Sequence, residues 1–469
     1  MILKFYDTYS RKKKIFKPLN DKQVKMFVCG PTVYDSPHLG HLRTYLFYDF
    51  LVRFLKLNGF KVFYLQNITD IDDKIINRAK EQKISPKKLA LKYEREYFED
   101  IKKLKIKGVT KYARATSYIN QIQDQIRRLI NKGYAYQTSD GIYYNIKKFK
   151  DYGKLAKRTA DKAQDATSRI DDSISKINKG DFCLWKFKKD DEPFWKFEYG
   201  DGRPGWHIED TAISEYYFGP QYDIHGGAVD LIFPHHEAEI AQMEALSGKK
   251  PMVKYWIHTG FLLVNGEKMS KSLGNFLTLK EVLKTSSVQT LRFFIASYHY
   301  HSPINFSNNL LLQTEESLQR ITDFYQQVIE SKNKNFKLIG SQEKIHLAKI
   351  KLFEENFFKA LADDFNSPLA ISQVFNLIKY FYKQDKKLLE NPKINKKLLE
   401  FFAKFNEIFE VLEVKSRVIP KKVTILLDKR EKLRKNKEYK KADELRKKIA
   451  ELGYEVIDTP EGTKIKKIK

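Results

Sequence analysis

The stretch VKMFVCGPTVYDSPHLGH, residues 24–41, decides the fold. Its apolar start, Val24–Val28, runs into a Cys-Gly-Pro sequence, which is the pattern of a buried strand that enters a loop. After Pro37, a residue that suits a helix entry, apolar side chains recur at helical spacing as far as Leu57. A second strand follows at Lys61–Ile68. This order predicts an α/β fold with a Rossmann-like, doubly wound parallel sheet, whose ligand lies at the carboxyl ends of the strands.

The rest of the chain alternates between charged helical segments and mixed segments, and 469 residues are too many for one core. In order, the pattern predicts helices at 71–132, a mixed insertion at 133–197, a return of the nucleotide fold at 205–227, helices at 275–409, and one last helix at 426–452 that ends at Gly453. No repeat period is present, which excludes a solenoid.

The composition favours a cytoplasmic protein with a polyanionic partner. Lys plus Arg is 87 and Asp plus Glu is 59, a formal net charge of +28, which favours nucleic acid, although a lysine-rich genome would also inflate this figure. The 2 cysteines cannot form a disulfide framework, as expected in a reducing cytosol. No apolar run has the length of a membrane span, and the first residues lack the apolar core of a signal peptide, so we expect no membrane contact.

The sequence His38-Leu39-Gly40-His41 places two imidazoles on one face of the predicted helix start. A helix start offers free N–H groups and a partial positive charge, and both favour phosphate. Gly40 would let a flat base approach the backbone, and the two imidazoles could stabilise charge on an α-phosphate. A pair of ordinary surface histidines is the alternative, and this motif alone does not decide between the two.

The sequence Lys268-Met269-Ser270-Lys271-Ser272 lies between glycines at 266 and 274. A mobile basic loop of this kind can close over the β,γ-phosphates of ATP and act mainly in the transition state. It is not a P-loop, because the required glycine and lysine spacing is absent.

Together, HLGH and KMSKS resemble the HIGH and KMSKS signatures of class I aminoacyl-tRNA synthetases. The surrounding sequence is more specifically similar to cysteinyl-tRNA synthetases, and the likeness covers nearly the whole chain. The blocks that carry it are CGPTVYDSPHLGH (29–41), NITDIDDKII (67–76), DFCLWK (181–186), GRPGWHIED (202–210), DIHGGAVDLIFPHHEAEIAQ (223–242), WIHTGFLLVNGEKMSKSLGNF (256–276), DDFNSPLA (363–370) and GYEVIDTPEGTKIK (453–466).

The resemblance implies a cysteine–tRNA ligase: L-cysteine and ATP, accompanied by Mg²⁺, form cysteinyl-adenylate, and the cysteinyl group passes to the 3′ end of tRNA(Cys). Two alternatives stay open. One is a cysteine ligase that uses an amino-sugar acceptor, although such relatives lack a full anticodon module. The other is a tRNA-binding paralogue without catalysis. We expect a monomer.

The resemblance also implies a Zn²⁺ site, because apolar packing cannot separate cysteine from serine whereas a soft metal binds thiolate far better than hydroxyl. The family holds zinc with two cysteines, a histidine and a glutamate. Three of these positions are Cys29, His235 and Glu239, and the fourth is Asp210 instead of cysteine. Aspartate also ligates zinc, so we expect an occupied but harder site; an empty pocket is the alternative.

His235 and Glu239 are four residues apart, so one helical face can present both, while His236 and Glu237 are expected to point elsewhere. A metalloprotease is excluded, because H-E-x-x-H would need histidine at Ile240. The other cysteine, Cys183, is predicted to pack in the core.

The remaining roles are carried over from the family residue by residue. Catalysis of adenylate formation falls to His38, His41, Lys268 and Lys271. ATP binding falls to Gly30, His38, Gly40, His41, Gly226, Gly227, Asp230 and Lys271. Cysteine binding falls to Cys29, Thr32, Trp206 and His225.

The domains implied by the resemblance follow the segments above. They are a first half of the catalytic domain at 1–120, a connective insertion at 121–200, a second catalytic half at 201–260, the KMSKS loop with a linking subdomain at 261–315, an α-helical bundle at 316–415 and an anticodon-binding module at 416–469. The strongly basic last helix is expected to contact tRNA phosphates.

Overall fold

The computed structural model describes residues 1–157, 175–269, 275–413, 421–459 and 462–467. Lys271 lies outside the described residues, so its role stays a prediction. Contacts divide the chain into two compact units, Met1–Leu412 and Glu413–Lys469. The finer domain limits given above also stay predictions.

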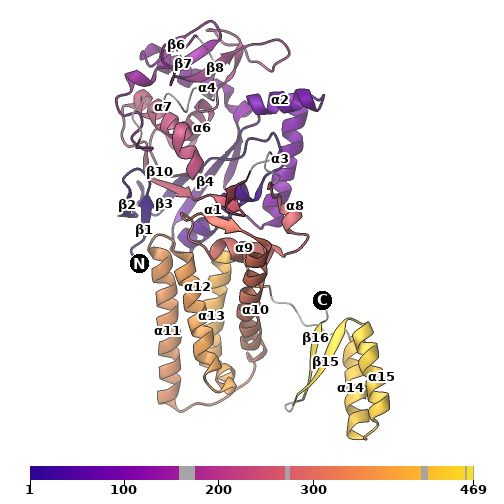
Figure 1. The fold of residues 1–469 in the computed structure, drawn as a ribbon. Coiled ribbons are helices and arrows are strands. Elements are labelled where there is room, and N and C mark those ends of the chain that lie inside the picture. The colour runs from indigo at the N-terminus through magenta and orange to yellow at the C-terminus, as the bar shows by residue number, and fades with distance from the viewer. Residues whose placement is uncertain (158–174, 270–274, 414–420, 460–461, 468–469) are drawn as a thin grey trace. The chain divides into compact units, whose positions relative to one another are not determined.

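The centre of the first unit is a parallel sheet of five strands in the order β11-β10-β3-β4-β5 (Figure 1). Their bounds are, in the same order, Val253–Thr259, Tyr222–Ala228, Gln23–Val28, Lys61–Ile68 and Lys111–Arg114. Strand β3 lies between β4, the next of these strands along the chain, and β10, which follows the insertion. The winding therefore reverses at the carboxyl end of β3, which confirms the predicted doubly wound fold.

Helix α1 (Leu39–Leu57) follows β3 as the sequence predicts, but it begins two residues after Pro37. His38 is its N-cap, with an extended backbone, and the His38 Nδ1 accepts a hydrogen bond of 3.3 Å from the His41 backbone N–H. A ring nitrogen satisfies one of the free donors of the first turn in this way, so the helix starts after the cap. Much of α1 is buried, which explains its apolar spacing.

The segment 71–132 was predicted to be helical, and α2 (Asp73–Glu81), α3 (Pro86–Lys103) and α4 (Ile119–Asn131) confirm most of this. The prediction is wrong at Lys111–Arg114, which forms the edge strand β5. This strand has four residues, too few for a period to show, and its pairing with the end of β4 defines it.

The insertion carries an antiparallel sheet of its own, in the order β6-β7-β8-β9. The strands are Ala135–Gln137, Gly141–Tyr144, Phe182–Phe187 and Gly202–Pro204. The chain then returns through α6 (Ile208–Phe218) to β10, and through a π-helical turn, η4 (Ile232–His236), and α7 (Glu237–Ser247) to β11.

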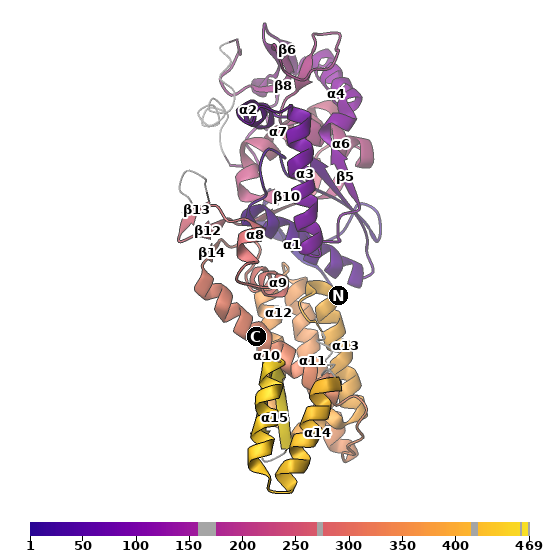
Figure 2. The same ribbon diagram turned by 90° about the vertical axis from the view of Figure 1, so that its right-hand side faces the viewer.

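After β11, the last strand of the central sheet along the chain, a small three-stranded sheet, two short helices and a helical bundle complete the first unit. The small sheet contains β12 (Leu262–Val264), β13 (Glu267–Lys268) and β14 (Ile304–Phe306), and the short helices are α8 (Leu279–Val282) and α9 (Val288–Ala296). The bundle contains α10 (Asn308–Glu330), α11 (Gly340–Ala362), α12 (Ser367–Tyr382) and α13 (Pro392–Phe409). Figure 2 shows this bundle on the opposite side of the nucleotide fold from the insertion. A hairpin of β1 (Lys4–Asp7) and β2 (Lys12–Ile15) opens the chain.

The second unit corrects the prediction of a single last helix. It contains two helices, α14 (Lys421–Lys435) and α15 (Tyr439–Glu451), followed by the hairpin β15 (Tyr454–Thr459) and β16 (Gly462–Lys467). The chain reverses where Lys437 has a φ of 61°. The reversal lets Val423, Ile449 and Val456 share a small core, which one straight helix could not bury. The predicted end at Gly453, with a φ of 83°, is confirmed.

Among the described helices, none combines the length and the apolar character that crossing a membrane requires.

Candidate active site

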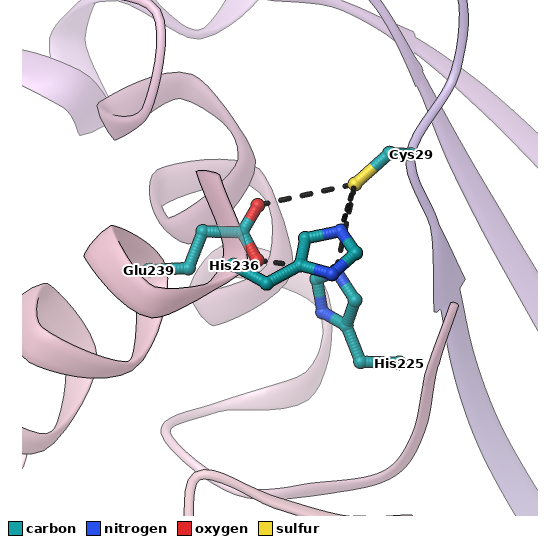
Figure 3. Close-up of side chains that lie close together, drawn as sticks. All are labelled: Cys29, His225, His236 and Glu239. Atoms are coloured by element: carbon teal, nitrogen blue, oxygen red, sulfur yellow. Dashed lines mark hydrogen bonds and ion pairs between the residues drawn. The ribbon is translucent and has the colours of Figure 1, made fainter. Parts of the chain in front are cut away.

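A group of buried side chains surrounds the Cys29 thiol at the carboxyl end of β3 (Figure 3). The Cys29 Sγ lies 3.2 Å from the His236 Nε2, 3.5 Å from the His225 Nε2 and 3.9 Å from the Glu239 Oε1. The Glu239 Oε2 lies 3.1 Å from the His225 Nε2. Strand β10 supplies His225, and the segment from η4 into α7 supplies the other two side chains.

The four residues predicted to hold a metal lie together in this group. The His235 Nε2 is 3.0 Å from the Asp210 Oδ2 and 3.2 Å from the Glu239 Oε1. Two sets of side chains each bring their ligand atoms within 4.8 Å of one another: Cys29, Asp210, His235 and Glu239 in one set, and Cys29, His225, His236 and Glu239 in the other.

The prediction that His236 points elsewhere is therefore wrong, because its Nε2 faces the Cys29 thiol. The prediction assumed regular helical spacing, but His236 ends a π-helical turn in which Phe233 has the non-helical angles φ −136° and ψ 131°. Glu237 does point away, and its carboxylate accepts backbone N–H bonds from Gly153 and Ala156 at 2.7 and 3.0 Å.

The cluster combines burial with an excess of acidic groups. Burial raises the pKa of the Cys29 thiol well above its usual value, and the carboxylates of Glu239 and Asp210 raise it further. Burial also raises the pKa of Glu239, and the charge of Asp210 adds to this. Within the described part of the chain, the buried Asp210 Oδ1 has no hydrogen-bond partner. Such an oxygen is costly unless a cation compensates it, so these donors fit a bound divalent metal.

A further layer of hydrogen bonds fixes the imidazole rings of the cluster. The His235 Nδ1 lies 2.8 Å from the His207 Nδ1, and the His225 Nδ1 lies 2.6 Å from the Tyr222 hydroxyl. Such contacts orient the rings and set which nitrogen faces a metal.

The rings of His236 and His258 are joined in the same way, at 2.8 Å between the His236 Nδ1 and the His258 Nε2. No sequence pattern predicted that His207, His236 or His258 belongs to the site. The one local signal for His258 was the alternation of side chains in β11, which puts Trp256 and His258 on the same face of the strand. His225 stacks on Trp256, with 4.4 Å between the ring centroids.

The HLGH residues lie at the start of α1 with their rings in contact. The His38 and His41 ring centroids are 3.6 Å apart and the planes are inclined by 21°. Burial lowers the pKa of His38 to about 4 and that of His41 well below its usual value, so both rings are neutral at pH 7. A Cβ at Gly40 would lie 2.9 Å from the His38 ring and 3.0 Å from the Met269 Cε. Glycine at this position therefore allows the His38 ring to lie close to the helix backbone.

The glycines assigned to ATP allow close approach within the protein. A Cβ at Gly30 would overlap the Asn67 carbonyl group, and one at Gly226 would overlap the Tyr48 hydroxyl. A Cβ at Gly227 would lie 2.9 Å from Leu231. These contacts explain the glycines by packing, and their contact with ATP stays a prediction.

Lys268 and Asp230 lie on the open side of the site. The Lys268 Nζ is 3.5 Å from the Asp230 Oδ2, and the two side chains are 61% and 45% exposed. The same ammonium group lies 4.6 Å above the centre of the Phe261 ring. Lys268 ends strand β13, so the β12–β13 hairpin presents it toward the residues after β10.

Thr32 and Trp206, assigned to cysteine binding, line a pocket of about 360 Å³ beside the cluster. The Trp206 indole stacks on the His235 ring, with 4.7 Å between centroids and 18° between planes. Cys183 is buried, as predicted for a packing side chain, and it also borders this pocket.

Three family profiles match successive parts of the chain. The profile described as tRNA synthetases class I (C) catalytic domain matches residues 15–316, that of the DALR domain matches 356–414, and that of the cysteinyl-tRNA ligase anticodon binding domain matches 417–464.

Curated relatives match over nearly their full length. A cysteine–tRNA ligase of Thermococcus gammatolerans is 43% identical over 100% of both chains, and one of Methanococcus vannielii is 42% identical over 100% of both. One of Thermoplasma volcanium is 43% identical over 97% of each chain.

Among solved structures, Mycobacterium tuberculosis methionyl-tRNA synthetase in complex with methionyl-adenylate is similar with a TM-score of 0.63. It is 14% identical, over 83% of this chain and 92% of that one, so this likeness shows the fold alone. The profile matches and the full-length relatives together show that this chain belongs to the cysteine–tRNA ligases, within the class I aminoacyl-tRNA synthetases.

Proposed function

We propose that this protein activates L-cysteine with ATP to form cysteinyl-adenylate and transfers the cysteinyl group to the 3′ end of tRNA(Cys). The observation that carries the proposal is the buried set Cys29, Asp210, His235 and Glu239, in which Cys29 directly follows the strand whose loop leads to HLGH. One loop thus joins the thiol of this set, which suits sulfur chemistry, to a motif that suits phosphate.

In the first step, a carboxylate oxygen of cysteine attacks the α-phosphorus of ATP, and the bond to the leaving pyrophosphate breaks. His38 and His41 are neutral, so their ring N–H groups can donate to the charged phosphoryl oxygens without a change of protonation. Lys268 and Lys271 would offset the charge that builds on the β,γ-phosphates, which Mg²⁺ shares. The reaction needs no covalent enzyme intermediate, so positioning of the substrates and electrostatic stabilisation of the transition state would account for the acceleration.

Discrimination against serine rests on the cluster. A zinc ion held by Cys29, Asp210, His235 and Glu239 would supply a soft partner for the substrate sulfur that a hydroxyl cannot match. The chain's own contribution is to hold these four donor side chains in a buried position, with the Trp206 indole stacked on the His235 ring.

Binding of tRNA would involve the second unit. Support comes from the anticodon-domain match at 417–464 and from exposed cations on α15, at Lys440, Lys441, Lys447 and Lys448. Cations on one helix attract the phosphate backbone, so tRNA affinity should fall steeply with salt. We include in the proposal a cytosolic monomer, and sedimentation would check its mass.

The experiment is cysteine-dependent exchange between ATP and pyrophosphate, followed by charging of a tRNA(Cys) transcript. The proposed function predicts both activities. Exchange without charging of any tRNA would favour an amino-sugar acceptor, and tRNA binding without exchange would favour a paralogue that lacks catalysis.

The metal is tested separately by its content per chain and by the absorption spectrum of the Co²⁺ form. Asp210→Ala should lower zinc occupancy, and Asp210→Cys should strengthen zinc binding by about tenfold, since a second thiolate softens the site. A metal-free protein that is fully active and still rejects serine would overturn the zinc assignment.

A further inference from the structure

Glu237 is a buried acidic side chain that belongs to neither set of metal ligands, although it lies in the chain between two cluster residues, His235 and Glu239. It is fully buried, and each of its carboxylate oxygens accepts a backbone N–H, from Gly153 at 2.7 Å and from Ala156 at 3.0 Å. A buried carboxylate is costly unless it is compensated, and hydrogen bonds to a charged acceptor are stronger than neutral ones. This contact therefore fixes the segment 153–156 against the start of α7.

The segment that this carboxylate holds consists of turns and contains no regular helix or strand. Residues 150–157 form successive turns, and Gly153 has a φ of 95°. Backbone N–H groups in such a segment lack the partners that a regular element supplies, so a side chain must accept from them. The buried side chains of Tyr152 and Leu155 belong to the same hydrophobic core as Ala238 of α7. Hydrogen bonds and apolar packing thus attach this part of the insertion to α7.

Two further contacts hold α7 to the insertion farther along the helix. The Tyr144 hydroxyl donates to the Ala241 carbonyl at 2.9 Å, and the Lys132 ammonium group donates to the Leu246 carbonyl at 2.6 Å. These contacts act at the middle and at the end of α7. Glu237 is the first residue of the helix, so its contact is the one of these three that lies beside the metal ligands.

The start of α7 is the part of this helix where the backbone geometry is least regular. His236 ends the π-helical turn η4, and such a turn is a rare departure from the α-helix. In a helix, side chains two positions apart point in nearly opposite directions. Because Glu237 is held on the side of the insertion, His235 and Glu239 are directed to the other side, where their nearest ligand atoms lie 3.2 Å apart. Figure 3 shows His236 and Glu239 facing the Cys29 thiol.

We propose that Glu237 is a positioning residue for the metal cluster, an inference that rests on the metal assignment of the proposed function. By accepting the N–H groups of Gly153 and Ala156, its carboxylate fixes the rotation of the chain at the start of α7. His235 and Glu239, on either side of it in the chain, then present their ligand atoms to the cluster without rearrangement. Partners that orient metal ligands contribute about 10- to 100-fold to metal affinity.

The test compares Glu237→Gln with Glu244→Gln. Glu244 lies in the same helix, is also buried, and accepts a backbone N–H from Met252 at 2.9 Å, so it is a matched control away from the cluster. In Glu237→Gln an amide N–H₂ group replaces one acceptor oxygen and meets a backbone N–H, so one of the two hydrogen bonds is lost. Transfer of zinc from the full-length protein to a chromogenic chelator should become faster by about tenfold in Glu237→Gln and should change by less than about twofold in Glu244→Gln.

Two further readouts separate positioning of the metal ligands from a general loss of stability. The absorption bands of the Co²⁺ form should shift or lose intensity in Glu237→Gln and stay unchanged in Glu244→Gln, even where both variants melt at a lower temperature. The preference for cysteine over serine in ATP–pyrophosphate exchange should fall in Glu237→Gln alone. Zinc release and Co²⁺ spectra that are the same in Glu237→Gln as in the unchanged protein would overturn the assignment, and so would equal changes in the two variants.

Hydrogen exchange on the unchanged protein decides the question if Glu237→Gln does not fold. Coupling between two sites is reciprocal, so an ion that is held through Glu237 must in turn stabilise the contact with the insertion. Removing zinc should therefore speed hydrogen exchange at the amides of Gly153 and Ala156 by about tenfold, and by more than at the Met252 amide. Equal acceleration at all three amides would overturn the proposal. An unchanged protein that binds no metal would instead contradict the zinc assignment of the proposed function.

Discussion

Cys29 is 5% exposed and is surrounded by buried histidine and carboxylate groups, whereas the Lys268 side chain is 61% exposed and its ammonium group lies 3.5 Å from the exposed Asp230 carboxylate. Both side chains belong to one candidate site. Groups that recognise a small substrate can be fixed in advance, since the substrate enters a finished pocket. Groups that act on a triphosphate need access and movement, because the leaving group must enter and depart.

The largest effect is expected from removing the Cys29 thiol, which belongs to the buried half of the site, the metal cluster. Cys29→Ser replaces the soft ligand with a hydroxyl, so metal content should fall to near zero and cysteine activation should drop by about 100-fold or more. Metal analysis and ATP–pyrophosphate exchange measure this. Cys183→Ser, outside the cluster, should keep the metal. Full zinc content in Cys29→Ser would mean that the histidine and carboxylate side chains of the cluster hold the ion without a thiolate.

Removing the Lys268 ammonium group should affect only the open half of the site, the exposed region around Lys268 and Asp230. Lys268→Ala should slow adenylate formation by about 100-fold and leave the dissociation constant of cysteine within about threefold, because charge builds on the phosphates in the transition state. Rapid-quench kinetics and equilibrium binding give the two values. Lys280→Ala, an exposed lysine on α8, is the control. Equal losses in both quantities would remove the distinction between the halves.

Arg43 holds the HLGH helix against neighbouring segments, and its replacement should have a smaller effect. Its buried guanidinium donates to the carbonyl groups of Gly260 and Phe261 at 2.6 Å, and also to Tyr300 and Ser302. It thereby ties the HLGH helix to the segment that enters β12. Arg43→Lys should cost about 2–4 kcal/mol of unfolding free energy, since buried acceptors lose their donors. Denaturant unfolding checks this, and zinc content should stay unchanged; a cost below 1 kcal/mol would show that water replaces the guanidinium.

His38 should make the free energy of unfolding of the catalytic unit depend on pH. Its folded pKa of about 4 lies below the unfolded value of about 6.5, so the unfolded chain binds more protons between these limits. Its contribution is therefore fully present above pH 6.5 and is lost as the pH falls toward 4, by at most about 3 kcal/mol. Urea unfolding at pH 7.5 and pH 5 should show a smaller difference for His38→Gln than for the unchanged protein. An unchanged difference would mean that His38 is already charged in the folded protein.

The sequence predicted those parts of the site that depend on neighbours in the chain. The strand before Cys29, the helix after His38 and the four-residue spacing of His235 and Glu239 are local patterns, and the structure confirms each of them. It brings Asp210 into the same group, as the resemblance implied. The facing of His236 was missed because a π-helical turn shifts the spacing there.

Local periodicity thus determined the strand–helix–strand order around Cys29 and HLGH, because a pattern of apolar residues reports on which faces must be buried. It did not determine the short strand β5 or the reversal between α14 and α15. Only the tertiary structure decided which distant side chains meet. The pairing of β10 with β3 and β11 sets His225 and His258 beside Cys29 and His236, and packing of the insertion against the loop after β4 forms the pocket at Trp206. Contacts between segments far apart in the chain depend on strand register and on chain reversals, which no short window of sequence contains.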